Sequence, residues 1–173
     1  MLLSSVKNKR KTSDFYSGKV NLSIEDLNSL NIIYQKIASK LNIGEIISEV
    51  YKHINELMDA SGFGIGLYNE NKDMITYSDY IEKNNVLGYY EESIQNKNSL
   101  TAWCFTNQKE IIINDVEKDT KEYVESVSVP GHGEIPQSLI YLPLNKANKR
   151  IGVITVQSFQ KNAYTVTHLN ILR

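Results

Sequence analysis

The fold is decided by one stretch near the end of the chain, Gln137-Ser-Leu-Ile-Tyr-Leu-Pro-Leu-Asn-Lys-Ala-Asn-Lys-Arg-Ile-Gly-Val-Ile-Thr-Val-Gln-Ser-Phe159. It holds two runs that are apolar on both faces, residues 139–144 and 151–156, joined by a polar turn. Strands that are apolar on both faces lie inside a sheet that is covered on both sides. The stretch therefore predicts an antiparallel hairpin at the centre of a domain. Pro143 is discordant, because a proline cannot donate to a strand ladder and favours an edge or a bulge.

The composition excludes several classes of protein. The 173 residues carry a formal net charge of −1, so no global basic field favours nucleic acid or an anionic membrane. A single cysteine excludes an internal disulfide framework. The sequence contains neither a signal-peptide core nor an apolar run long enough to span a membrane. We therefore expect a cytoplasmic protein without direct contact to nucleic acid or membrane.

The N-terminal third predicts a linker and two helices. Residues 1–21 are polar and lysine-rich, as in a flexible linker, and a single domain is expected over residues 22–173. The first helix begins at Ser23 and carries a heptad seam, which consists of Leu27, Leu30, Tyr34, Ile37 and Leu41. The seam favours a homodimer through this helix, and the alternative is packing on its own domain. Asn42 opens a second helix, which Gly62 is expected to end.

The middle of the chain alternates short strands and helices. The predicted elements are strands over residues 62–69 and 74–81, a helix over residues 100–107 capped by Ser99, and a strand over residues 111–113. In the first strand, Gly64 and Gly66 share one face, so we expect the second helix to approach that face closely. Residues 82–98 are polar and interrupted, without a predicted element.

The last third contains a long connection and a terminal helix. Residues 116–136 form either a functional lid or a surface loop. A helix begins after Thr165 and runs to Arg173 without a stop signal, which indicates a piece of a longer protein.

Two segments carry a family resemblance. One is the hairpin, with Leu-Pro-Leu, a polar turn and Ile-Gly-Val-Ile-Thr-Val. The other is Ser99-Leu-Thr-Ala-Trp-Cys-Phe-Thr-Asn-Gln-Lys-Glu-Ile-Ile-Ile-Asn-Asp115. Together they resemble GAF domains, which are sensory modules of bacterial signal-transduction proteins, over roughly residues 25–173. The resemblance implies an α/β fold of the α+β type with a central antiparallel sheet of five or six strands. Long terminal helices would cover one face, and short helices and loops the other.

The histidines and the single cysteine do not indicate a catalytic site. His53, His132 and His168 are scattered, without the close pairs usual in metal sites, so no metal site is predicted. Cys104 would need a base such as His132 to act as a nucleophile, and a lone cysteine between two aromatic residues is more typical of a core. GAF-like free-methionine-sulfoxide reductases use several cysteines, and bilin-binding relatives commonly have histidine after theirs. Phe105 follows Cys104 here. The cyclic-nucleotide signature is incomplete, and no cofactor is identified.

The resemblance therefore implies a non-catalytic sensor that binds an unidentified small molecule. It would relay its state through dimerised terminal helices to an output domain such as a histidine kinase or nucleotide cyclase. The alternatives are a small redox enzyme that uses Cys104 and a ligand-free dimerisation spacer. In GAF-like folds the ligand lies between the sheet and the covering loops, where a cavity of ~300 Å³ or more is expected. The candidate binding residues in this sequence are Tyr68, Tyr77, Trp103, Asn114, Asp115, His132, Ser138 and Tyr141.

Overall fold

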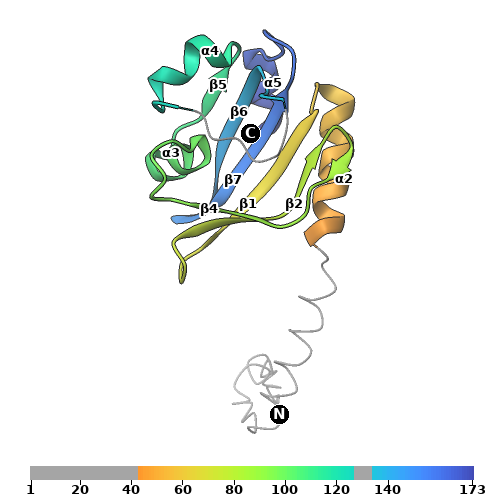
Figure 1. Cartoon of the computed structure of the whole chain (residues 1–173). Helices are drawn as coiled ribbons and strands as arrows, with labels where there is room; N and C mark the ends of the chain where they lie inside the picture. Colours follow the sequence, from red (N-terminus) through yellow and green to blue (C-terminus); the bar gives the residue numbers. More distant parts are fainter. Residues whose placement is uncertain (1–42, 127–133) are drawn as a thin grey trace, which may run out of the picture. The chain divides into compact units, whose positions relative to one another are not determined.

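The computed structural model of the chain describes residues 43–126 and 134–173 (Figure 1). The predicted linker, the seam of the first helix and His132 lie outside the described residues. The described helices are α2 (Ile43–Leu57), α3 (Leu100–Asn107), α4 (Val116–Asp119), the 3₁₀ turn η1 (Thr120–Glu122) and α5 (Val166–Leu172). The described strands are β1 (Gly62–Asn69), β2 (Met74–Glu82), β3 (Asn85–Val86), β4 (Tyr90–Ser93), β5 (Ile111–Ile113), β6 (Ser138–Lys146) and β7 (Lys149–Ser158).

The described strands form one antiparallel sheet in the order β3-β2-β1-β7-β6-β5, with β4 also paired to β2. The hairpin predicted from the deciding stretch is β6–β7, which pairs from Ser138 opposite Ser158 to Lys146 opposite Lys149. Because β7 also pairs with β1, and β6 with β5, the hairpin lies inside the sheet as predicted. The sheet has seven strands, since the polar segment after β2 adds β3 and β4, which the sequence pattern did not indicate.

Pro143 fits inside β6 because of the short neighbour on its other side. In the pairing of β6 with β7, Pro143 lies opposite Val153. On the outer side, β5 pairs only as far as Tyr141. The position of the proline therefore needs no ladder hydrogen bond on that side.

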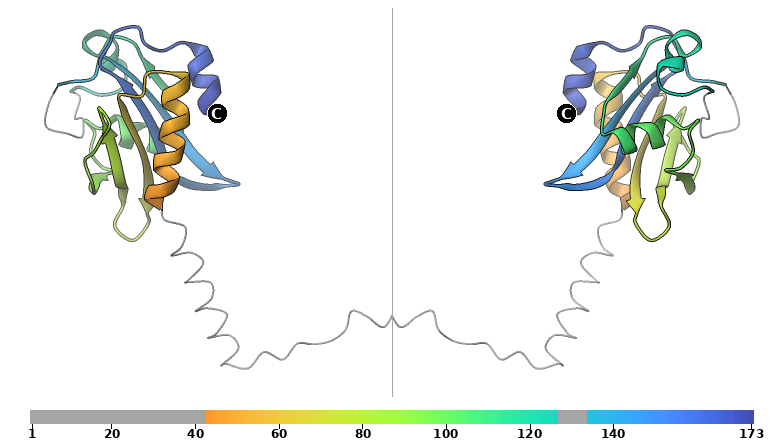
Figure 2. Two further views of the ribbon diagram at one scale, coloured as in Figure 1. Left: turned by 90° about the vertical axis from the view of Figure 1, so that its right-hand side faces the viewer. Right: turned by 90° about the vertical axis from the view of Figure 1, so that its left-hand side faces the viewer.

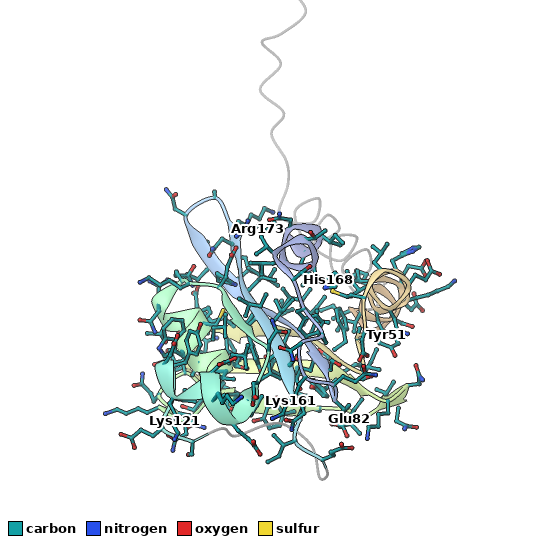
Figure 3. The ribbon with its side chains drawn as sticks, turned by 90° about the horizontal axis from the view of Figure 1, so that it is seen from above. Tyr51, Glu82, Lys121, Lys161, His168 and Arg173 are labelled. Carbon is teal, nitrogen blue, oxygen red and sulfur yellow. The ribbon has the colours of Figure 1, made fainter. Side chains whose placement is uncertain are left out.

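Helices cover both faces of the sheet (Figures 1 and 2). One core cluster joins Ile47 of α2 and Leu169 of α5 to Ile140 and Val156 of the central strands. The cluster on the opposite face joins α3, α4 and the segment after them to the same strands. Seen from above, Tyr51 of α2 and His168 of α5 lie on one side of the domain, and Lys121 of η1 lies on the other (Figure 3). The predicted fold class is confirmed.

Local caps set the ends of the helices. The Ser99 hydroxyl accepts a hydrogen bond from the Ala102 amide at 3.1 Å, as predicted for the start of α3. The prediction that Gly62 ends α2 is wrong: α2 ends at Leu57. Asp59 forms the turn between α2 and β1. Its carboxylate accepts a hydrogen bond from the Ser61 amide at 3.0 Å, which fixes that turn.

Candidate functional site

Four tyrosines meet on the face of the sheet that α3 covers. Tyr77 and Tyr80 of β2 and Tyr141 of β6 are each at most 2% exposed, and Tyr90 of β4 is partly buried against the same core. The ring of Tyr77 lies 6.2 Å from that of Tyr80 and 5.9 Å from that of Tyr90, between centroids. We call these four residues the tyrosine cluster. Aromatic walls that carry a few polar groups are the usual makeup of a small-molecule site.

A bulge in β2 brings two of these rings to the same face. Between the pairs Gly64–Tyr80 and Gly66–Tyr77, β1 advances by two residues and β2 by three. Residues three apart in a regular strand point to opposite faces, and the extra residue cancels that alternation. Tyr77 and Tyr80 consequently belong to one core cluster.

The glycines of β1 make room for these rings. A Cβ on Gly64 would lie 2.8 Å from Cδ2 of Tyr80, and a Cβ on Gly66 would lie 2.7 Å from Cζ of Tyr77. The close approach expected at this face is therefore present. The expectation that the second helix makes it is wrong, because α2 packs on the other face with Phe63.

Hydrogen bonds satisfy only part of the cluster. The Tyr77 and Thr101 hydroxyls are 3.0 Å apart and share one hydrogen bond. Nε2 of Gln157 donates to the Tyr141 hydroxyl at 3.0 Å. The Tyr80 hydroxyl and Oε1 of Gln157 are buried and have no partner among the described residues. A buried polar group without a partner costs about 1–3 kcal/mol, so these two atoms call for a reason.

One carboxylate lies in the same region. Glu92 of β4 is 6% exposed and accepts hydrogen bonds from the Tyr90 hydroxyl at 2.5 Å and from Nδ2 of Asn96 at 2.8 Å. No lysine, arginine or histidine of the described residues forms an ion pair with it. Among the described residues, the Glu92 carboxyl at the edge of the cluster is therefore held by hydrogen bonds and not by an ion pair.

Burial keeps the tyrosine hydroxyls protonated. It raises the pKa of Tyr77 and of Tyr80 well above the ordinary range, and the neighbouring Tyr141 adds to both rises. Burial likewise raises the pKa of Tyr141 itself. At neutral pH each hydroxyl is consequently available as a hydrogen-bond donor.

A cleft of about 310 Å³ opens on the outer side of α3. The ring of Trp103 meets that of Tyr123 edge to face, with centroids 4.9 Å apart, and both rings line the cleft. Asn96, which holds Glu92, lines it as well. Trp103 thus lies on the helix that covers the tyrosine cluster, at the wall of a separate cleft.

Tyr68 lies near the C-terminal end of β1. Its ring packs against Phe105 with centroids 4.5 Å apart, and its hydroxyl donates to Asp73 at 2.6 Å. It lines a second, more open cleft of about 550 Å³ between the β1–β2 and β6–β7 turns, beside Arg150.

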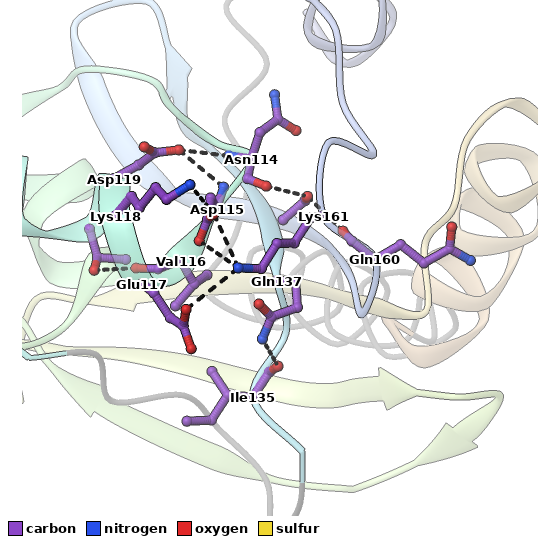
Figure 4. Close-up of polar contacts among 12 residues, drawn as sticks. Asn114, Asp115, Val116, Glu117, Lys118, Asp119, Ile135, Gln137, Gln160 and Lys161 are labelled. Carbon is purple, nitrogen blue, oxygen red and sulfur yellow. Dashed lines mark hydrogen bonds and ion pairs between the residues drawn. The ribbon is translucent and has the colours of Figure 1, made fainter.

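Asn114 joins the end of β5 to the segment before α5, beside the ion pair of Asp115 with Lys161 that Figure 4 shows. Its Nδ2 donates to the Tyr164 carbonyl at 2.8 Å, and its Oδ1 accepts from the Tyr164 amide at 3.0 Å. The buried Ser138 hydroxyl donates to the Gln160 carbonyl at 2.7 Å. Next to them, Lys161 lies 3.1 Å from both carboxylate oxygens of Asp115. These side chains clamp residues 160–164 to the start of α4.

The seven candidate residues that the structure describes are therefore spread over the domain, and the eighth, His132, lies outside the described residues. The structure brings Tyr77 and Tyr141 into one cluster and places Trp103 on its covering helix. Asn114, Asp115 and Ser138 form the clamp, and Tyr68 lines the open cleft. Whether any of the eight binds a ligand stays a prediction. Sequence reasoning missed Tyr80 and Gln157, because only the register of β1 and β2 reveals that they face the cluster.

Cys104 lacks the surroundings of a reactive cysteine. Its side chain is 0% exposed, and burial raises the pKa of the thiol to about 12, with the Glu110 charge adding to the rise. The thiolate is the nucleophile, so this position does not favour redox catalysis. Nowhere in residues 43–126 and 134–173 do three potential metal ligands gather. In the same part of the chain, each helix falls short of the length and hydrophobicity that a membrane span requires.

Residues 40–173 match the family model described as the GAF domain. The chain is 27% identical over 143 residues to the formate hydrogenlyase transcriptional activator FhlA of Escherichia coli, and the match covers 82% of this chain and 20% of FhlA. The chain thus spans about a fifth of the length of this curated relative.

Solved structures share the fold at low sequence identity. The GAF domain of an Acinetobacter phosphoenolpyruvate-protein phosphotransferase aligns with a TM-score of 0.62 and 18% identity, over 87% of both chains. The free methionine-R-sulfoxide reductase of Neisseria meningitidis aligns with a TM-score of 0.55 and 15% identity, over 73% of this chain and 70% of that one. At such identities the likeness concerns the fold alone.

Proposed function

The chain belongs to the GAF domain family, and from that premise we propose that it is a non-catalytic regulatory domain which binds a small molecule at the tyrosine cluster. The observation that carries the proposal is the pair of buried polar atoms without partners, the Tyr80 hydroxyl and Oε1 of Gln157. A core gains nothing from such groups, whereas a ligand that hydrogen-bonds to them is bound more tightly.

The structural change on ligand binding is relayed to α5 through the clamp that Asn114, Asp115 and Ser138 form. Cys104 and Phe105 of α3 belong to the same core cluster as the tyrosines, and so does Val116 of α4. Asn114 and Asp115 precede α4 directly and hold Tyr164 and Lys161, which lead into α5. A small shift of α3 and α4 on binding therefore moves α5, a two-state device of the kind that signalling domains use.

The domain acts within a longer cytoplasmic signalling protein that is a homodimer through its N-terminal helix. FhlA, a transcriptional activator, is much longer than this chain, which supports an output domain that regulates transcription. The family resemblance implied an output domain such as a histidine kinase or a nucleotide cyclase, and each of these outputs fits a relay through paired helices.

Titration with a metabolite library tests the proposal through Trp103, the single tryptophan of the chain. A true ligand is expected to change Trp103 fluorescence saturably and to alter hydrogen exchange of the α5 amides. In an Asn114→Ala variant, the fluorescence change should persist while the α5 response shrinks. A ligand that leaves α5 exchange unchanged in the wild-type protein would refute the relay, and a library without any ligand would refute the sensor.

A further inference from the structure

One buried tyrosine connects the last helix of the domain to the first described helix. Tyr164 is 3% exposed and lies two residues before α5. Its ring meets the imidazole of His168 in α5 edge to face, with centroids 6.1 Å apart. Its hydroxyl donates to the backbone carbonyl of Asp59 at 2.7 Å. Because Asp59 lies in the turn that follows α2, the side chain of Tyr164 contacts both α5 and the end of α2.

The carboxylate of Asp59 fastens the same turn to the neighbouring strands. It accepts hydrogen bonds from the Ser61 amide at 3.0 Å, from the Ser61 hydroxyl at 2.6 Å and from the Ser158 hydroxyl. Burial raises the pKa of this carboxyl, but the hydrogen bonds from Ser158 and Ser61 outweigh that effect, so the pKa lies below its usual value. Ser158 is the last residue of β7. Residues 158–164 are therefore held to the α2–β1 turn at both of their ends.

The two helices also share one core. Ile47 of α2, Tyr164 and Leu169 of α5 belong to the same core cluster, and both helices lie on the same side of the domain (Figure 3). Helix α5 has only seven residues, and Leu169 is the buried one. A helix this short has little stability of its own, so its position depends on tertiary contacts such as those of Tyr164.

We propose that the Tyr164 hydroxyl and the Asp59 carbonyl form a latch, which makes α5 and the end of α2 open and close as one unit. The latch is distinct from the clamp, which ties residues 160–164 to the start of α4. Opening of either helix end breaks the latch and so lowers the free-energy cost of opening the other, because such a coupling is reciprocal. The coupling needs no ligand and is therefore testable whether or not the tyrosine cluster binds one.

Native-state hydrogen exchange tests the latch when α5 is broken from outside. Asn170 is exposed, and Asn170→Pro removes a backbone hydrogen bond of α5 and clashes with the preceding turn. The reporter is the Met58 amide, which donates to the Ile54 carbonyl at 2.9 Å and closes the last turn of α2. Asn170→Pro should speed exchange of the Met58 amide about threefold to tenfold, because the latch opens with α5. The Trp103 amide, in α3 on the other face, should keep its exchange rate.

Removal of the latch hydroxyl gives the matched comparison. In the Tyr164→Phe background, Asn170→Pro should leave exchange of the Met58 amide unchanged. Tyr51→Phe is the control, since it removes a tyrosine hydrogen bond of α2, to Oδ1 of Asn84 at 2.7 Å, without touching the latch. In that background the response of Met58 to Asn170→Pro should persist. The inference is overturned if Met58 does not respond to Asn170→Pro, if it responds equally with and without the Tyr164 hydroxyl, or if the Trp103 amide is accelerated as much.

Discussion

Asn114 and Tyr164 are joined by two hydrogen bonds across 50 residues of sequence: Nδ2 of Asn114 donates to the Tyr164 carbonyl at 2.8 Å, and Oδ1 accepts from the Tyr164 amide at 3.0 Å. The side-chain amide of Asn114 thus pairs with the Tyr164 backbone as the backbone of a neighbouring strand would. It ties the β5–α4 junction to the segment that leads into α5.

Asn114→Ala should destabilise the domain. The substitution removes both bonds and leaves the Tyr164 backbone groups without their partner, which costs about 1–3 kcal/mol of unfolding free energy. Urea denaturation measures the loss. The matched control is Asn71→Ala in the exposed β1–β2 turn, which should change stability little. Equal effects of the two substitutions would show that the clamp does not contribute to stability.

Tyr80→Phe should stabilise the ligand-free domain. The hydroxyl has no partner, so its removal relieves a desolvation cost of about 1–3 kcal/mol. For a chain of this size that corresponds to roughly 2–4 °C in melting temperature per kcal/mol. Tyr77→Phe is the comparison. It leaves the buried Thr101 hydroxyl without its hydrogen-bond partner and should therefore lower the melting temperature. A lower melting temperature for Tyr80→Phe would mean that its hydroxyl has a partner in solution.

Alkaline pH should unfold the domain cooperatively. Burial raises the pKa of Tyr77, Tyr80 and Tyr141 in the folded state, and unfolding restores values of about 10. Their contribution to stability is complete below pH ~10 and is lost as pH rises further, because the unfolded state then releases protons that the folded state keeps. Each such group costs about 1.4 kcal/mol per pH unit in that range.

Tyrosinate absorbance and circular dichroism, followed in one titration, test this pH dependence. The buried tyrosines should ionise together with the loss of secondary structure, and Tyr80→Phe should move the midpoint to higher pH. Ionisation of all tyrosines near pH ~10 with native dichroism would contradict it.

A homodimer through the N-terminal helix stays a prediction, since its seam lies outside the described residues. Light scattering at tens of micromolar should report a dimer. Leu30→Asp should weaken it, because a carboxylate enters the seam. Asn31→Asp adds the same charge one position off the seam and should have little effect. A strict monomer, or equal effects of the two changes, would rule out this interface.

Much of the fold could be predicted from local pattern. The β6–β7 hairpin was evident because both of its runs are apolar on both faces, which a buried central strand requires. Ser99 and Thr165 identified the starts of α3 and α5 because capping depends on neighbouring residues alone. Strand β4 was not predicted, since its residues are mostly polar and it exists only through its pairing with β2.

The candidate site was less predictable because its geometry depends on register. Tyr77 and Tyr80 share a face only through the bulge in β2, which the spacing of three does not reveal. The partner of Asn114 is 50 residues away, so its side chain was interpreted as part of a binding site. Trp103 was placed on the right helix, yet it lines the cleft outside that helix.

The most direct test of the central claim is a thermal-shift screen of one metabolite library against the wild-type protein and Tyr80→Phe. A compound that binds at the cluster is expected to raise the wild-type melting temperature by about 2–4 °C, equivalent to about 1 kcal/mol of added stability at the ligand concentration used, and to raise that of Tyr80→Phe much less. A library in which no compound stabilises the wild-type protein, or in which every stabilising compound acts equally on both proteins, would contradict the assignment of the tyrosine cluster as the ligand site.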